Sequence, residues 1–161
     1  MIYSNEALSP PFQISDYPNP APLQKEVHLN CILLVDDDRA TNFLNKLLLD
    51  KMGVADTIKT ARNGMEAMDY LMRAFQGERD CPVPDLICLD INMPMVNGWE
   101  FLERYEPMPD DFKKSITVLM LSTSLRQEDI ERAKQLPLIK GFVLKPLTEN
   151  EVMRVLDENF G

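Results

Sequence analysis

The sequence predicts an α/β protein in which a doubly wound, five-stranded parallel sheet carries helices on both faces. Five short apolar runs, typical of buried strands, alternate with stretches of helical period. Serial βα units joined by right-handed crossovers produce a parallel sheet of this kind. A chain of 161 residues is long enough for one domain with a packed core.

Residues 1–30 differ from the rest of the chain. They hold five of the twelve prolines and show neither a helical nor a strand period. We predict a proline-rich flexible tail over residues 1–30 and a folded domain over residues 31–161. Such a composition is typical of a linker, although Tyr3, Phe12 and Tyr17 leave open a peptide that docks on its own domain or on a partner.

Two βα units open the domain. Cys31–Val35 has the length and branching of a buried strand, and Asp38 is a good N-cap for the helix after it. One apolar face recurs in that helix at Phe43, Leu44, Leu47 and Leu48. Thr57–Ala61 is a more polar strand suited to a sheet edge, and Gly77 ends the helix that follows. That second helix is lined by Met65, Met68, Leu71, Met72 and Phe75.

Three further units complete the pattern. The expected strands are Asp85–Leu89, Ile116–Leu121 and Gly141–Leu144, and the second of these is apolar enough to be buried on both faces. The expected helices are Gly98–Tyr105, Glu128–Gln135 and one capped by Thr148 with Glu151, which buries Val152, Val155 and Leu156. We expect Asp110 and Asp111 in a solvated loop.

Polar residues follow four of the strands, where the carboxyl ends of a parallel sheet form a crevice. They are Asp36–Asp38, Asp90–Asn92, Ser122–Ser124 and Lys145–Pro146. Asp36, Asp37 and Asp90 would repel one another there, so a cation is implied. Oxygen ligands without histidine select Mg²⁺. With Lys145 and the Ser122 hydroxyl to bind phosphoryl oxygens, an aspartate can be phosphorylated.

Together these motifs make the segment Cys31–Phe160 resemble the receiver domain of two-component response regulators. The matching stretches are Leu34–Asp38, Leu89–Pro94, Asn97–Gly98, Leu121–Ser122 and Lys145–Pro146. The resemblance implies a flavodoxin-like (βα)5 fold with strand order 2-1-3-4-5 and a stand-alone regulator similar in plan to that of chemotaxis. It further implies that Asp90 accepts a phosphoryl group from a histidine kinase or a phosphotransfer protein.

The same resemblance assigns the remaining site residues. Asp37, Asp90 and the backbone carbonyl of Asn92 would ligate Mg²⁺, and Asp36 would hold a metal-bound water. Phosphorylation would draw in Ser122 and let Phe142 turn inward, which remodels the surface of the fourth helix, fifth strand and fifth helix for an unidentified protein target.

Three features depart from the commonest pattern of the family. Ser122 replaces a frequent threonine, and Phe142 lacks a tyrosine hydroxyl. The segment Gln135–Gly141 replaces a small-residue turn and is expected to reshape the partner surface. Asn92 and Ser124 flank the line along which water attacks the acyl phosphate, and we expect them to tune its lifetime.

Composition argues against several other classes. A net charge of −9 argues against broad nucleic-acid binding, and no apolar run approaches the roughly 20 residues that would insert into a membrane. No secretory signal is recognised, and Cys31, Cys81 and Cys88 lack metal spacing, which favours reduced core thiols in a cytoplasmic protein. His28 is the only histidine, so a histidine-based site is excluded.

Rival functions share parts of this pattern. An aspartate-nucleophile phosphohydrolase needs an acid where Asn92 stands, so we expect a phosphoacceptor rather than an enzyme. An FMN carrier needs hydroxyls and glycines where the first strand ends in aspartates, and a nucleotide switch needs a phosphate-binding loop that the sequence lacks. A receiver-like module that signals without phosphorylation stays open as the alternative.

Overall fold

The computed structural model describes residues 27–124 and 126–161, so most of the predicted tail lies outside the described residues. Five parallel strands form one sheet in the order β2-β1-β3-β4-β5, which confirms the predicted order and the edge position of the second strand. The strands are β1 (Leu29–Val35), β2 (Ala55–Ala61), β3 (Leu86–Asp90), β4 (Thr117–Ser122) and β5 (Ile139–Leu144).

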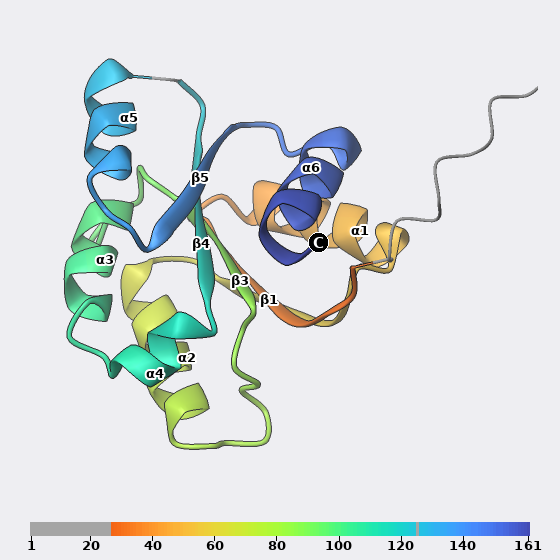
Figure 1. Ribbon diagram of the computed structural model, residues 1–161, viewed down its shortest axis with the longest axis vertical. Coiled ribbons are helices and arrows are strands. Elements are labelled where there is room, and N and C mark those ends of the chain that lie inside the picture. Colours follow the sequence, from red (N-terminus) through yellow and green to blue (C-terminus); the bar gives the residue numbers. More distant parts are fainter. Residues whose placement is uncertain (1–26, 125) are drawn as a thin grey trace, which may run out of the picture.

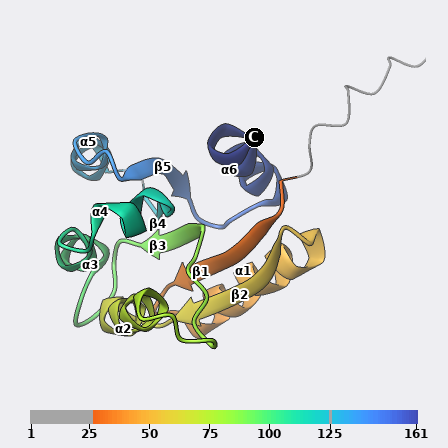
Figure 2. The same ribbon diagram turned by 60° about the horizontal axis from the view of Figure 1, so that its bottom comes forward.

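Helices cover both faces of this sheet. They are α1 (Arg39–Met52), α2 (Gly64–Phe75), α3 (Gly98–Tyr105), α4 (Asp110–Lys114), α5 (Gln127–Lys134) and α6 (Glu149–Phe160). Figures 1 and 2 show α1 and α6 on one side of the sheet and α2, α3 and α5 on the other. Two apolar clusters fill the two interfaces, because the central strands bury side chains on both faces.

Local signals correctly predicted several helix boundaries. Asp38 caps α1 by accepting a hydrogen bond from the backbone N–H of Ala40, and Thr148 caps α6 by accepting one from that of Glu151. The helix predicted over Gly98–Tyr105 has those bounds. These caps depend on residues within one turn of each other, which is why a sequence pattern can find them.

The apolar face of α1 is not the face that the helix buries. Asn42, Asn45 and Leu49 are buried, whereas Phe43, Leu44 and Leu47 are 65%, 60% and 55% exposed. The helix is oriented by Asn42, whose side-chain amide donates hydrogen bonds to backbone carbonyls at the ends of two strands. That orientation turns Phe43, Leu44 and Leu47 towards solvent, whereas Leu48 is half-buried against the core.

α2 packs through Leu71 and small residues, so only part of its predicted apolar lining is buried. Its buried positions are Gly64, Ala67, Leu71 and Ala74, and Met65, Met72 and Phe75 are about half exposed. A Cβ at Gly64 would lie 2.5 Å from the Val96 side chain, so the helix approaches its neighbour more closely than a larger residue allows. Of the residues predicted to line this helix, Leu71 is buried and Met68 is half-buried against the core, whereas the other three lie on the outer side.

Four segments differ from the prediction, and two of them, β2 and β5, each begin two residues before the predicted strand. Asp110 and Asp111 begin the short helix α4 instead of a solvated loop; five residues after Pro109 are too few to show a helical period. β1 begins at Leu29, two residues before the predicted strand. The Asp85 carboxylate accepts hydrogen bonds from the backbone N–H groups of Asn30 and Cys31, which extends the strand backwards.

Candidate functional site

Three carboxylates meet at the carboxyl ends of the adjacent strands β1 and β3. Asp36 and Asp37 follow β1, and Asp90 is the last residue of β3. One oxygen from each carboxylate lies within 4.8 Å of the others. Asp36 is 2% exposed and Asp90 is 5% exposed, whereas Asp37 faces solvent. The cluster is therefore a buried pair of carboxylates with a third at its mouth, which is a suitable oxygen site for a hard cation.

Lys145 brings a positive charge to this cluster from the end of β5, an edge strand of the sheet. It follows β5, and its backbone N–H donates a 2.7 Å hydrogen bond to the carbonyl of Ser122. Its ammonium forms an ion pair with Asp36 and lies 3.3 Å from Asp90 Oδ1. One ammonium balances one of the three carboxylates, so the site keeps an excess of negative charge.

Burial and nearby charges shift the pKa values of Asp90 and Lys145. Burial raises the pKa of Asp90 to about 6, the Asp36 carboxylate raises it as well, and the Lys145 ammonium opposes both effects. Burial by itself lowers the pKa of Lys145, but its hydrogen bond with Asp36 and the nearby carboxylate charges outweigh burial and raise it. Lys145 is consequently a permanent cation, and Asp90 is ionised at neutral pH.

Ser122 places a hydroxyl at the end of β4, beside β3. The residue is 1% exposed. Its Oγ donates a 2.7 Å hydrogen bond to the carbonyl of Ser124 and accepts one of 3.2 Å from the Ser124 N–H. The hydroxyl is therefore held by its own loop, and a stronger acceptor nearby would have to compete with the Ser124 carbonyl.

Asn42 supports the site and was missed by sequence reasoning. This buried residue of α1 donates hydrogen bonds from Nδ2 to the carbonyls of Asp36, at 2.9 Å, and Ala61, at 3.2 Å. Its Oδ1 has no partner among the residues that the structure describes. The signal that could have found it is a polar residue one helical turn after the Asp38 cap, on the face opposite Leu44 and Leu47.

Gly98 permits the close approach of α3 to Asp90. A Cβ at this position would lie 2.6 Å from the Asp90 carbonyl oxygen, a backbone atom that cannot move aside. Its N–H donates a 2.8 Å hydrogen bond to the carbonyl of Ile91. Asn92, in the same loop, is exposed and directs its backbone N–H to Asp90 Oδ1 at 3.4 Å.

Phe142, the predicted switch residue, lies on β5 opposite Met120 of β4. Its side chain is half-buried and packs against the apolar cluster beneath α2, α3 and α5. It is therefore neither fully inside nor free in solvent, and movement in either direction changes the surface next to α5.

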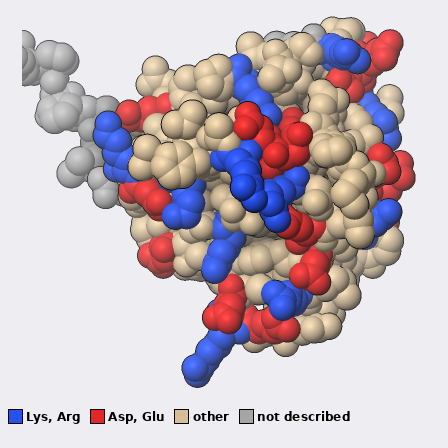
Figure 3. Space-filling view, turned by 180° about the vertical axis from the view of Figure 1, so that it is seen from behind, with Lys and Arg blue, Asp and Glu red and all other residues tan. Residues whose placement is uncertain are grey.

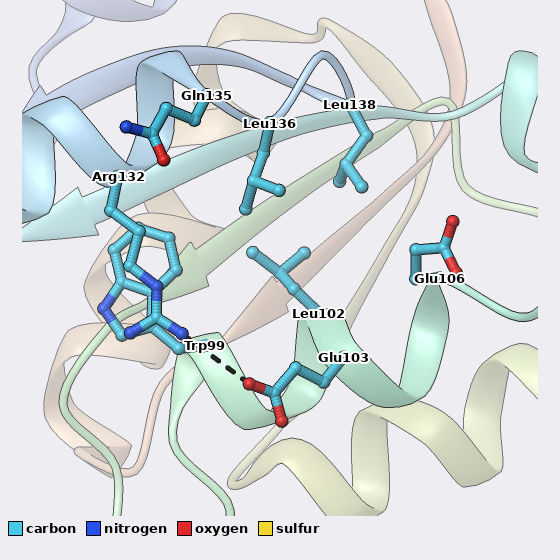
Figure 4. Close-up of a pocket in the computed structure, with 8 residues that line it drawn as sticks. All are labelled: Trp99, Leu102, Glu103, Glu106, Arg132, Gln135, Leu136 and Leu138. Carbon is cyan, nitrogen blue, oxygen red and sulfur yellow. Dashed lines mark ion pairs between the residues drawn. The ribbon is translucent and has the colours of Figure 1, made fainter.

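The predicted segment Gln135–Gly141 helps to line a separate cavity of about 270 Å³ between α3 and α5. Figure 4 shows Arg132 of α5 over the ring of Trp99, at 4.5 Å from its centre, and an ion pair of Arg132 with Glu103 at 3.6 Å. None of the clustered carboxylates lines this cavity. The segment thus shapes the surface between two helices and not the carboxylate site.

Surface charge, helix apolarity and thiol burial can be compared with what the composition predicts about nucleic-acid binding, membrane insertion and the cysteines. On the face shown in Figure 3, acidic and basic side chains are interspersed, unlike the positive stripe that follows a nucleic-acid backbone. Within residues 27–124 and 126–161, no helix has the length and apolarity needed to cross a bilayer. Cys31, Cys81 and Cys88 are buried free thiols, as predicted.

Comparison with known proteins agrees with this geometry. The solved structure of a two-component response regulator from Cytophaga hutchinsonii is similar to this chain, with a TM-score of 0.74 and 30% sequence identity. The match covers 81% of this chain and 96% of that one. A probable methanogenesis regulatory protein, FilR2 of Methanothrix harundinacea, is 30% identical over 127 residues, 79% of each chain. The response regulator Rcp1 of Synechocystis is 36% identical over 100 residues, 62% of this chain and 65% of Rcp1.

The family model for the response regulator receiver domain matches residues 32–157, which include every clustered carboxylate, Ser122 and Lys145. The chain belongs to the response regulator receiver domain family.

Proposed function

We propose that this chain is a phosphoacceptor: Asp90 takes a phosphoryl group from a histidine kinase or a histidine phosphotransfer protein, and the phosphorylated domain then signals by protein contact. One observation supports this most directly. Asp90 is a buried carboxylate 3.3 Å from Lys145 Nζ, inside a cluster that keeps excess negative charge. A nucleophilic carboxylate with a permanent cation beside it is the arrangement that phosphoryl transfer to aspartate requires.

The donor set fits a magnesium ion. Its side-chain ligands are all carboxylate oxygens, and the exposed position of Asp37 leaves room for the waters that Mg²⁺ retains. Asp37, Asp90 and the backbone carbonyl of Asn92 would hold the ion, and Asp36 would act through a bound water. When bound, Mg²⁺ would neutralise charge on the transferred phosphoryl oxygens.

The chain's own residues account for the transfer. An Asp90 oxygen attacks phosphorus, so an O–P bond forms while the N–P bond of phosphohistidine breaks and the imidazole leaves, taking up a proton from solvent. Asp90 must be ionised to attack, and its pKa of about 6 keeps it ionised at neutral pH. Lys145 binds a phosphoryl oxygen as charge develops on it.

The signal would begin at Ser122. A phosphoryl group on Asp90 adds roughly −1.5 to −2 charges and acceptor oxygens stronger than a carbonyl. The Ser122 hydroxyl would leave the Ser124 carbonyl for the phosphoryl group, and the half-buried Phe142 would turn into the vacated space. That movement would remodel the surface of α5, β5 and α6, the counterpart of the family's output surface, without any tyrosine hydroxyl.

The related proteins support a signalling role. Those named above are regulators in their own descriptions, and the solved structure from Cytophaga hutchinsonii is that of a two-component response regulator. We propose an output by docking on a target protein or by relay of the phosphoryl group to a histidine of another protein. The buried free thiols fit a reducing compartment, and we propose action in the cytoplasm.

The test is intact mass after incubation with acetyl phosphate. We expect a gain of one phosphoryl group that requires Mg²⁺, is lost in Asp90→Asn and persists in Asp111→Asn, a matched change at an exposed aspartate of α4. If the folded wild type gains no phosphoryl group from acetyl phosphate or from a phosphorylated histidine kinase, the phosphorylation-independent module becomes the better assignment.

A further inference from the structure

The outer face of α1 is an apolar patch that the described residues leave uncovered. Phe43, Leu44 and Leu47 are adjacent on one side of the helix, and each is more than half exposed. Single exposed leucines are common on protein surfaces, but Leu47 lies three and four residues after Leu44 and Phe43, so the three form a contiguous apolar patch of the kind that marks an interaction site. This patch is called the α1 patch below.

The chain enters the domain at the end of the same helix. The His28 ring lies 3.1 Å from the carbonyl of Gly53, the C-cap of α1, and the Leu29 N–H donates a 2.8 Å hydrogen bond to the carbonyl of Val54. With a rise of about 1.5 Å per residue, Leu47 lies roughly 8 Å along the helix from its last residue and Phe43 roughly 14 Å. Residues 1–26 precede this point, and about ten extended residues reach roughly 33 Å.

Charge on the two segments is complementary. The exposed charged residues of α1 are Arg39, Lys46, Asp50 and Lys51, a net charge of +2 in a protein of net charge −9. Residues 1–26 carry Glu6, Asp16, Lys25 and Glu26, a side-chain charge of −2. An acidic segment is therefore tethered at the end of a basic helix, a match that favours association.

Residues 1–26 also contain the side chains that an apolar patch would bind. Seven large apolar or aromatic residues are distributed through them: Ile2, Tyr3, Leu8, Phe12, Ile14, Tyr17 and Leu23. Five prolines restrict the backbone, which lowers the entropy that the segment would lose on docking. A short tether gives an effective concentration on the order of millimolar, so a weak contact suffices.

We propose that residues 1–26 dock on the α1 patch of their own domain, with their aromatic and aliphatic side chains against Phe43, Leu44 and Leu47. The docked segment would lie along the outer face of α1. This proposal does not depend on phosphorylation of Asp90.

Paramagnetic relaxation in the full chain tests the proposal. A nitroxide is attached through Ser15→Cys, since the three native cysteines are buried, and unmodified wild-type protein treated in the same way shows that they stay unlabelled. We expect the methyl signals of Leu44 and Leu47 to lose most of their intensity and to regain it when the nitroxide is reduced. The methyl signal of Met72, on α2 across the sheet, is expected to keep its intensity.

Matched variants separate docking from chance proximity. Phe43→Ser with Leu47→Ser removes most of the patch at exposed positions, and we expect the Leu44 signal to recover. Met72→Ser, an equally apolar change at an exposed position of α2, should leave the Leu44 signal attenuated. Equal attenuation of Leu44 and Met72 in the wild type would overturn the proposal.

A mixed sample identifies the molecule that supplies the segment. Isotope-labelled protein without nitroxide is combined with nitroxide-bearing protein that carries no isotope label. Docking within one chain predicts no attenuation of Leu44 in this mixture. Attenuation there would show that the segment binds a second copy and would overturn docking on its own domain.

Discussion

Lys145 and Asp36, which are 109 residues apart in the sequence, form an ion pair across the carboxyl end of the sheet. Both side chains are nearly buried, with exposures of 13% and 3%. The pair joins the loop after β5 to the loop after β1, two strands that are not neighbours in the sheet. It therefore ties together the two sides of the carboxylate site.

Removal of Lys145 is expected to destabilise the protein in the absence of divalent metal. Lys145→Met leaves two buried carboxylates without their cation, a loss of about 3 kcal/mol in the free energy of unfolding. Urea unfolding in the presence of a chelator measures this, with the exposed Lys134→Met as control. Adding Asp36→Asn should recover part of the loss, and equal effects of the two lysine changes would contradict the prediction.

The raised pKa of Asp90 predicts a pH-dependent stability in metal-free protein. The folded state holds this proton up to a pKa of about 6, whereas the unfolded carboxyl releases it near 3.8. Between those values the folded state binds more protons, so the free energy of unfolding falls as pH rises, and it levels off above pH 6.

Asp90→Asn is expected to abolish this decline and to be more stable than wild type at pH 7, by at most about 3 kcal/mol on the usual conversion of a pKa shift. Urea midpoints of both proteins between pH 4 and 8, with a chelator present, provide the measurement. Parallel pH profiles for the two proteins would show that Asp90 is not the group responsible.

The pKa of His28 is expected to lie above the ordinary value for histidine. Nε2 lies 2.6 Å from the Asp56 carboxylate and Nδ1 lies 3.1 Å from the Gly53 carbonyl, so both nitrogens act as donors only in the protonated ring. The hydrogen bond to Asp56 is the main cause of the raised pKa. Its stabilising contribution is complete below pH 6.5 and is lost as pH rises through the raised pKa.

Because His28 is the only histidine, its ring signals in an NMR titration are unambiguous. Asp56→Asn should move the His28 pKa back towards 6.5. Asp50→Asn, which removes an exposed carboxylate paired with Lys46 on α1, should leave it unchanged. A shift of the same size in both variants would point to general charge effects instead of the contact with Asp56.

Asn42→Ala is expected to cost about 1–3 kcal/mol of stability, because it removes the side-chain donor to the Asp36 carbonyl and one of the two donors to the Ala61 carbonyl, which keeps the Asp36 N–H. The measurement is the free energy of unfolding, together with the rate at which acetyl phosphate modifies Asp90, which should fall as the Asp36 loop loosens. Asn45→Ala changes the other buried asparagine of α1. Among the described residues Asn45 has no hydrogen bond to the Asp36 loop, so the modification rate should be retained in that variant.

Interactions over short sequence distances were determined by the sequence itself. Thr148 and Glu151 lie within one turn, and Asp38 adjoins the helix that it caps. Each cap can therefore be recognised from residues that are neighbours in the sequence. Apolar runs likewise predicted the strands, and the parallel arrangement of the strands placed Asp36 and Asp90 at the same carboxyl end of the sheet.

The orientation of α1 and the contact of Lys145 with Asp36 were decided only by the tertiary structure. The leucines of α1 predict an apolar face but not whether the sheet or another segment covers it, and hydrogen bonds from Asn42 to two separate strands settled that question. These features depend on interactions between groups that are distant in sequence, and a local sequence pattern carries no information about such interactions. What local patterns establish is the set of elements, and what packing establishes is which of their faces remain available to bind.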